Sequence, residues 1–262
     1  MGRHFTHKIS QGFTIVETML VLAVTGVLII TLLVGVGGSI NAQRYMDSVV
    51  SLKSTLQDQY AMVTNVTNDR QTDVACGTST QTVAPGQSDC VLLGRYLSIA
   101  GGNVTTAAIV GYSTGTATGA TDVATIKANY QFGISTSSIE TKTLEWGARI
   151  AWPVSGTGKQ PLNTARNLTM LVIRSPQTGT SYTFTSDNVS NIADVNSATL
   201  TGIMVADTAA IPGQEQRTLC VDSSGSGPEV LAVYIDQAAS GPTSIETRSY
   251  ATIVSLGGNT KC

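Results

Sequence analysis

Glu17 is the only charged residue between positions 13 and 43, so it is the residue in this chain whose charge most needs an explanation. A carboxylate inside a membrane helix costs about 2.5–3.5 kcal/mol on insertion scales and normally has a polar partner there. If the chain were cut after Gly12, the new α-amino group of Phe13 would stand four residues before Glu17. That amine, or the amine of a neighbouring copy, would then pair with the carboxylate. The alternative is a Glu17 side chain that reaches the polar interface by itself.

Two stretches spell catalytic motifs, but neither has the residues that the chemistry needs. Residues 111–115 read Gly-Tyr-Ser-Thr-Gly, like a nucleophile elbow, which requires a general base and a strand-to-helix turn. Both histidines, His4 and His7, lie in the first dozen residues. Residues 156–159 resemble part of a phosphate loop, but Pro153 and Gln160 replace the first glycine and the closing hydroxyl residue. Without a CxxC pair or an EF-hand frame, the sequence predicts no catalytic residue, no cofactor and no metal site.

The cysteines point to an oxidising compartment. All of them lie beyond the apolar segment, and their even number predicts two disulfides among Cys76, Cys90, Cys220 and Cys262. Three pairings are allowed, of which we favour Cys76–Cys90 and Cys220–Cys262, since these close one short loop and fix the last residue. Each would contribute about 2–4 kcal/mol. The alternative is a set of buried free thiols, which mass determination with and without reductant would reveal.

The composition favours an extracytoplasmic β-protein over a helical cytosolic enzyme. The 262 residues suit one domain of about 200 residues with an appendage. Only 12% of them are charged and 5% aromatic, whereas a typical soluble domain has about 25% charge. Gly, Ser and Thr are abundant, as in sheets with many turns. The net charge of −2 offers no basic field for nucleic acid or anionic lipid.

The N-terminal region reads as a short basic leader followed by a membrane span. Residues 1–12 contain Arg3 and Lys8 and no acid, and residues 19–40 are nearly all apolar or small. That run is about long enough to cross a bilayer, whereas a secretory signal core has about 7–15 residues. The basic flank predicts that residues 1–12 stay in the cytoplasm and that the rest lies outside. Glycines interrupt the span and allow close packing or local unwinding: Gly26, Gly35, Gly37 and Gly38.

A second periodic pattern follows the span. Six apolar residues recur at steps of three and four, while polar residues occupy the other faces: Tyr45, Val49, Leu52, Leu56, Tyr60 and Val63. This spacing is typical of an amphipathic helix. No Pro or Gly separates residues 39 and 69, so we expect one helix over residues 13–65, with its first half in lipid and its second half on a partner surface.

The rest of the chain is expected to form an antiparallel β-rich head. Apolar or alternating runs separated by turn residues predict strands at residues 91–99, 104–112, 124–134, 144–152, 168–174, 181–185, 199–205, 217–221, 230–235 and 247–256. The fold class is therefore α+β, with a long N-terminal membrane-spanning helix packed on antiparallel sheet. The expected parts are a leader (1–12), a polymerisation half-helix (13–40), an amphipathic half-helix (41–67) and the head (68–262).

The start of the chain resembles the prepilin family, which includes type IV pilins and type II secretion pseudopilins. The resemblance is carried by Gly12-Phe13-Thr14-Ile15-Val16-Glu17 and the apolar run that follows, and it covers about the first fifty residues. It implies that prepilin peptidase cuts after Gly12 and that Phe13 becomes N-methylated. It also implies that Glu17, then the fifth residue, guides filament assembly and that Gly26 loosens the helix. Val34 stands where many major pilins have proline, which favours a minor pilin or a pseudopilin.

A second, shorter resemblance concerns the head. Residues 217–225 and 230–235 are similar to a hairpin of H-type pseudopilins and related minor pilins, whose heads are β-sandwiches on the pilin helix. A generic hairpin with a Ser/Gly turn is an equal explanation. The fold implied by the two resemblances is a pilin fold with a sandwich-like head.

These features predict a structural subunit of a pilus-like filament. The family implies four kinds of partner: other pilin or pseudopilin subunits, prepilin peptidase, an inner-membrane assembly platform, and lipid before assembly. The subunit would be single-pass in the inner membrane with its head outside, and later part of an extracellular or periplasmic filament. A filament-displayed adhesin or DNA-binding minor pilin is an alternative, although the cleaved chain would have 13 basic against 17 acidic residues, a net charge of −4 that does not support DNA. A second alternative is a secreted β-domain with an ordinary signal peptide cut near Ala42, after Ser39-Ile40-Asn41.

Overall fold

The long helix α1 (Ile15–Thr64) is the first element of the chain and forms without interruption over 50 residues. The computed structural model describes residues 14–65, 90–152, 154–155, 165–204, 217–222, 231–236, 238–249, 252 and 260–261. The chain divides into two compact units, Met1–Gln43 and Arg44–Cys262, and we call the second the head unit. The boundary falls inside α1, at the point where the apolar run gives way to the amphipathic stripe.

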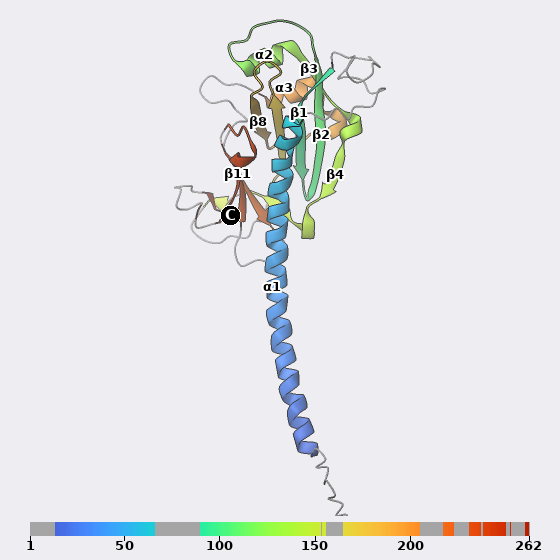
Figure 1. Ribbon diagram of the computed structural model, residues 1–262, viewed down its shortest axis with the longest axis vertical. Coiled ribbons are helices and arrows are strands. Elements are labelled where there is room, and N and C mark those ends of the chain that lie inside the picture. The colour runs from blue at the N-terminus through green and yellow to red at the C-terminus, as the bar shows by residue number, and fades with distance from the viewer. Residues whose placement is uncertain are drawn as a thin grey trace, which may run out of the picture. The chain divides into compact units, whose positions relative to one another are not determined.

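The second half of α1 belongs to the head unit and is held by its apolar stripe. All six apolar residues of the expected stripe are buried, from Tyr45 at 5% exposure to Leu52 and Leu56 at 0%. Two polar residues of the same face, Ser48 and Gln59, are buried as well. The prediction that this stripe packs on the head is therefore correct. Figure 1 shows this second half of α1, light blue to cyan, running beside β1 and β2.

The larger sheet of the head unit has the strand order β3-β2-β1-β7-β8, and β4 also pairs with β2. Every strand pair among the described residues is antiparallel. The strands are β1 (Cys90–Ala100), β2 (Asn103–Ser113), β3 (Tyr130–Ile134), β4 (Glu140–Thr143), β7 (Leu168–Arg174) and β8 (Ser181–Ser186).

The smaller sheet has the order β11-β10-β9-β5. Its strands are β5 (Arg149–Ala151), β9 (Arg217–Asp222), β10 (Leu231–Ile235) and β11 (Ile245–Ser249), and a further pair joins β6 (Val154–Ser155) to β12 (Thr260–Lys261). Strands β9 and β10 pair antiparallel, as the expected hairpin requires.

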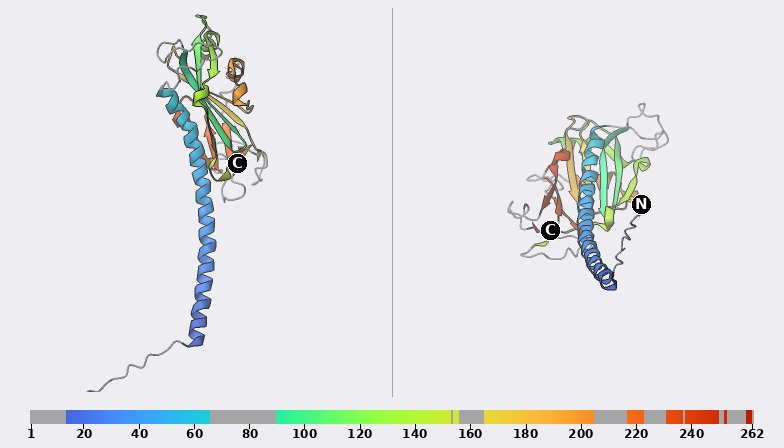
Figure 2. Two further views of the ribbon diagram at one scale, coloured as in Figure 1. Left: turned by 90° about the vertical axis from the view of Figure 1, so that its right-hand side faces the viewer. Right: turned by 60° about the horizontal axis from the view of Figure 1, so that its bottom comes forward.

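The core has two parts, one on each face of the larger sheet. On one face, residues from β1, β2 and β7 pack with the α1 stripe and with the smaller sheet. On the other face, β-strand side chains pack with α2 (Asp122–Asn129) and α3 (Ser197–Ile203). Strand β7 serves both, since Met170 and Val172 face α1 whereas Leu171 and Ile173 face the short helices. Figure 2 shows α3 and α1 on opposite sides of this sheet.

Four of the expected strands differ from the structure. Residues 124–134 begin as α2 and become β3 only at Tyr130, because Thr121 caps the helix by accepting a hydrogen bond from the Ala124 N–H. In the segment expected at 199–205, residues 199–203 belong to α3, whose N-cap Asn196 accepts from the Thr199 N–H. In both segments Thr, Val and Ile suggest strand, yet the cap and one buried face produce a helix.

The other two differences involve turns. Residues 144–152 contain the 3₁₀ turn η2 (Glu145–Gly147) before β5 begins. Trp146 has φ 57° there and Gly147 has φ 68°, so the chain reverses through left-handed conformations. The strand expected at 247–256 begins earlier, at Ile245 in β11, after the 3₁₀ turn η4 (Pro242–Ser244). The remaining 3₁₀ turns are η1 (Thr136–Ser138) and η3 (Ile192–Asp194).

Candidate functional site

The first turn of α1 is built around Thr14 and Glu17. The Thr14 hydroxyl accepts a hydrogen bond from the Glu17 N–H at 3.3 Å, and the Thr14 carbonyl accepts from the Thr18 N–H at 3.1 Å. Thr14 is thus the N-cap and Glu17 the third helical residue, which is the S/T-x-x-E arrangement of a capping box. The sequence contains this signal, although attention to the charge of Glu17 alone misses the role of Thr14.

The Glu17 carboxylate has no hydrogen-bond or ion-pair partner among the described residues. It is exposed and lies one turn into the helix, where the positive end of the helix dipole favours an anion. Chemically, the carboxylate is available to accept hydrogen bonds or to pair with a cation from another molecule. Gly12 and Phe13, the expected cleavage and methylation residues, lie outside the described residues.

The threonine hydroxyls in the apolar half of α1 donate hydrogen bonds inside the helix. Thr18 donates to the Ile15 carbonyl at 2.8 Å, Thr25 donates to the Val21 carbonyl at 2.8 Å, and Thr31 to a carbonyl one turn earlier at 2.9 Å. A polar group left unpaired in hydrocarbon costs several kcal/mol, so these bonds make the segment compatible with lipid. Within this half-helix, only the Glu17 side chain carries an unbalanced charge.

The apolar residues of this half-helix are exposed in the chain by itself. Ile15 is 76% exposed, Leu22 70% and Val34 74%. One helix of the described residues is long and apolar enough to cross a membrane, and its most hydrophobic 18-residue window has mean hydropathy 2.8 with none of it buried. Residues 15–40 span about 39 Å at about 1.5 Å per residue, which exceeds a hydrocarbon layer of about 30 Å. An exposed apolar surface of this size is typical of a segment that lipid or another protein covers.

No neighbouring atom requires glycine at four positions of this half-helix. A Cβ atom added at Gly26, Gly35, Gly37 or Gly38 would meet nothing within 4 Å. Glycine inside a helix costs roughly 0.5–1 kcal/mol relative to alanine. At Gly26 the helix is continuous, and the expected loosening at this position stays a prediction.

Two tyrosines hold the second half of α1 in the head. The Tyr45 hydroxyl donates to the Val221 carbonyl at 3.1 Å and accepts from the Leu231 N–H at 2.6 Å, so it joins β9 to β10. Burial raises the pKa of Tyr45, and the hydrogen bond with the Leu231 backbone opposes this. Tyr60 bonds the Thr183 hydroxyl of β8 at 2.8 Å, and burial raises its pKa to about 12. The helix is therefore fastened to both sheets by neutral phenols.

A charged cluster joins the two sheets. The Arg166 guanidinium, 4% exposed, contacts the Asp187 carboxylate at 2.8 Å, and Arg217 of β9 contacts the second oxygen at 3.2 Å. Arg166 also donates to the Thr218 carbonyl at 2.8 Å and stacks on Trp152 at 4.3 Å. Burial lowers the pKa of Arg166, while Asp187 opposes that shift. The planar guanidinium and its several donors suit a structural link between sheets.

The cysteines are placed only in part. Cys90 opens β1 and Cys220 lies in β9, and both are disulfide-bonded. Cys76 and Cys262 lie outside the described residues, so the expected pairing stays a prediction.

The serine motif crosses the end of β2: residues 111–113 belong to the strand, and residues 114–115 belong to a loop that precedes α2 by several residues. Gly111 sits in β2, where an added Cβ would stand 2.5 Å from the Gln131 carbonyl oxygen, so the glycine serves close strand packing. The Ser113 hydroxyl donates to the Gly115 carbonyl at 3.2 Å. Within the described ranges, no group of three His, Cys, Asp or Glu residues is placed to hold a metal ion. The Gly-Thr-Gly-Lys stretch at 156–159 lies outside them.

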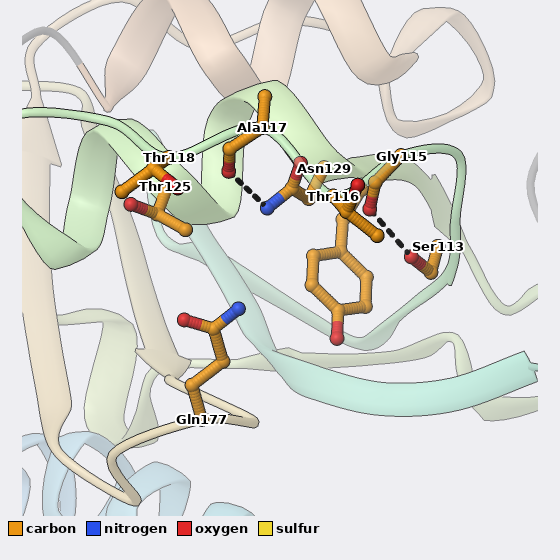
Figure 3. A pocket seen from close by; sticks show the side chains of 9 residues that line it. Ser113, Gly115, Thr116, Ala117, Thr118, Thr125, Asn129 and Gln177 are labelled. Carbon is orange, nitrogen blue, oxygen red and sulfur yellow. Dashed lines mark hydrogen bonds between the residues drawn. The ribbon is translucent and has the colours of Figure 1, made fainter.

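The head also contains a polar cavity of about 310 Å³ beside α2, lined by side chains that include Ser113, Asn129 and Gln177. Figure 3 shows these side chains around it, with Gln177 opposite the others. No sequence motif indicates this cavity, because its residues come from separate elements.

Comparison with known proteins found no matching protein-family model, no matching curated protein and no matching solved structure.

Proposed function

We propose that this chain is a structural subunit of a type IV pilus-like filament, either a minor pilin or a type II secretion pseudopilin. The observation that carries the proposal is the half-helix of α1 that precedes the head: it is apolar, exposed along its length and charged only at Glu17. Lipid covers such a surface before assembly, and the same surfaces of neighbouring subunits cover it in a filament. In this proposal the head has a pilin fold.

The proposed assembly step depends on Glu17. Cleavage after Gly12 by prepilin peptidase creates an α-amino group on Phe13, which keeps its positive charge when N-methylated. Glu17 has no partner in its own described chain, so its carboxylate is free to pair with the Phe13 amine of a neighbouring subunit. In hydrocarbon this pairing is strong, and it sets the axial offset between subunits.

The test is incorporation into sheared filaments. Glu17→Ala is expected to leave the amount of membrane-inserted protein unchanged and to lower incorporation at least tenfold. Glu17→Gln separates two roles, because Gln supports a capping box as Glu does but has no charge. If the negative charge of Glu17 is required for assembly, Glu17→Gln is expected to lower incorporation as much as Glu17→Ala does. If only the capping-box role of Glu17 matters, Glu17→Gln is expected to be incorporated normally.

A matched control is Thr18→Val, one residue further along. The Thr18 hydroxyl is bonded within its own helix, so its loss removes no contact to another subunit. This variant is expected to enter filaments normally. Normal incorporation of Glu17→Ala would remove Glu17 from the assembly mechanism.

One observation favours the second alternative, a secreted β-domain with an ordinary signal peptide. The boundary between the two units follows Gln43, one residue after the signal-peptidase site at Ala42. A chain beginning at Gln43 would keep Tyr45 and the entire buried stripe. The mature N-terminus distinguishes the two proposals, since the filament subunit begins at Phe13.

A further inference from the structure

The loop between β2 and α2, residues 114–121, is held in a fixed shape by one face of α2. Thr125 and Asn129, four residues apart, point to the same side of that helix. The Thr125 hydroxyl accepts a hydrogen bond from the Gly119 N–H at 3.0 Å, and Asn129 Nδ2 donates to the Ala117 carbonyl at 2.8 Å. At Gly119 the loop lies so close to α2 that an added Cβ would stand 2.6 Å from the Thr125 nitrogen. These contacts hold the loop in one defined conformation.

Loop and helix enclose the polar cavity of about 310 Å³. This volume lies at the lower end of the range of about 300–1000 Å³ for small-molecule sites. In the part of the chain that the structure describes, no charged side chain lines it, and its polar groups are hydroxyls and amides from Ser113, Thr116, Thr118, Thr125, Asn129 and Gln177. Tyr130 adds an aromatic surface. Figure 3 shows the Gln177 amide facing the loop from the other side of the cavity.

Asn129 forms part of the wall of the cavity. The residue is 3% exposed, and its Oδ1 atom is buried and has no hydrogen-bond partner among the described residues. An added Cβ at Gly115 would be 3.7 Å from this oxygen, so Gly115 lies against it. A ligand in the cavity therefore makes its hydrogen bonds with other groups of the lining.

The wall opposite Asn129 is also fixed. Gln177 lies in the turn between β7 and β8, which Asp122 of α2 ties down by accepting hydrogen bonds from Ser175 at 3.0 Å and Thr178 at 2.8 Å. The Gln177 amide and the hydroxyls of Thr116 and Thr118 have no partner among the described residues. They are available to donate to and accept from a ligand.

The chemical groups that line the cavity indicate which class of ligand it can bind. Among the described residues of the lining, an anion would meet no cation and a cation would meet no carboxylate. Hydroxyl groups both donate and accept, so they match a mixture of hydroxyl and amide groups. A ring with several hydroxyls can also lie against the Tyr130 ring.

We propose that this cavity binds a neutral saccharide, with the hydroxyls of Thr116 and Thr118 and the Gln177 amide as its hydrogen-bond partners. The cavity lies near the end of α1, where Arg174 donates to the Thr64 carbonyl at 3.4 Å, and Gln177 follows in the next turn. Residues 44–64 of the same helix separate it from the start of the head unit by about 30 Å at about 1.5 Å per residue. Binding by a single subunit does not depend on filament assembly.

The test is saturation-transfer NMR on the full-length protein in a detergent without a sugar headgroup, since a glycosidic detergent would compete. The probes are glucose, galactose, mannose and N-acetylglucosamine, with the matching uronic acids and free amino sugars as charged counterparts. We expect saturable binding of at least one neutral sugar and at least tenfold weaker binding of its charged counterpart.

Two variants and a control test the location. Thr116→Val with Thr118→Val removes two exposed hydroxyls at constant shape, and Gly115→Ala places a methyl group 3.7 Å from Asn129 Oδ1 without a backbone clash. Both are expected to weaken binding at least tenfold, whereas Thr143→Val, an exposed threonine of β4, leaves it unchanged. Absence of binding for all four neutral sugars would overturn the proposal. Binding that is equal in the cavity variants and the wild type would overturn it as well.

Discussion

Tyr60 offers a quantitative test of how the second half of α1 is held in the head. Its side chain is buried at 3% exposure, bonds Thr183 at 2.8 Å, and has its pKa raised from 10.0 to about 12 by burial. The folded state holds the phenolic proton more tightly than the unfolded state. The stability from this proton is therefore complete below about pH 10 and is lost as the pH rises through about 12. Two pKa units correspond to about 3 kcal/mol.

The assay is urea unfolding of the full-length protein in detergent at several pH values between about 7 and 11. Both tryptophans, Trp146 and Trp152, lie in the head unit, so their fluorescence reports the unfolding of this unit. Tyr60 alone is expected to lower the free energy of unfolding by up to about 1.4 kcal/mol per pH unit above pH 10. Tyr60→Phe costs about 1–3 kcal/mol at pH 7, because it leaves the buried Thr183 hydroxyl without its partner. In this variant the free energy of unfolding is expected to decrease less steeply at alkaline pH. Some decrease remains, because burial also raises the pKa of Tyr45.

The matched control is Thr183→Val, which removes the partner of Tyr60 and keeps the phenol. This variant leaves the Tyr60 hydroxyl buried without its bond and is expected to lose about 1–3 kcal/mol at pH 7. It retains the steep alkaline decline, because the phenol still titrates. An equally steep decline in Tyr60→Phe and in the wild type would refute the reasoning.

The remaining predictions concern the core and the charged cluster, and the same fluorescence assay measures both. Leu56→Ala, at a fully buried position of the α1 stripe, is expected to lower the free energy of unfolding by about 2–5 kcal/mol. Val50→Ala, at a 60% exposed position of the same helix, should change it by less than about 0.5 kcal/mol. Equal effects of the two would contradict the packing of the stripe. Asp187→Asn leaves the buried Arg166 guanidinium without its carboxylate and should cost about 3 kcal/mol, the lower end of the range for a broken buried pair, because Asp187 is partly exposed. Glu140→Gln, in an exposed pair, should have almost no effect, and a similarly small loss for Asp187→Asn would show that the cluster does not hold the sheets together.

The long helix and its stripe could be predicted from sequence because their signals are local. The expected range 13–65 agrees with the observed Ile15–Thr64, and the steps of three and four from Tyr45 to Val63 identify the buried face. Gln59 was not predicted to be buried, because its amide pairs with Arg95 of β1, which only the folded structure brings near.

The short helices show where local signals compete. Strand propensity in residues 124–134 and 199–205 suggested sheet, whereas Thr121 and Asn196 offered N-caps that decide for helix. A search for capping residues would have found both helices. The same search would have identified Thr14 as the cap of α1.

The two polar sites of the head could not be predicted, because they depend on long-range contacts. Arg166, Asp187 and Arg217 meet only when β9 and the end of β8 come together across the sheets. The cavity beside α2 likewise combines a loop after β2, one face of a helix and the β7–β8 turn. A single sequence contains no spacing that links these segments.

The most direct test of the central claim is the mature N-terminus, determined by mass spectrometry of native membranes and of sheared filaments. The filament proposal predicts that the chain begins at Phe13, with or without an N-methyl group, in both samples. A chain that begins near Gln43 would contradict it and would mean that the head is released as a secreted β-domain.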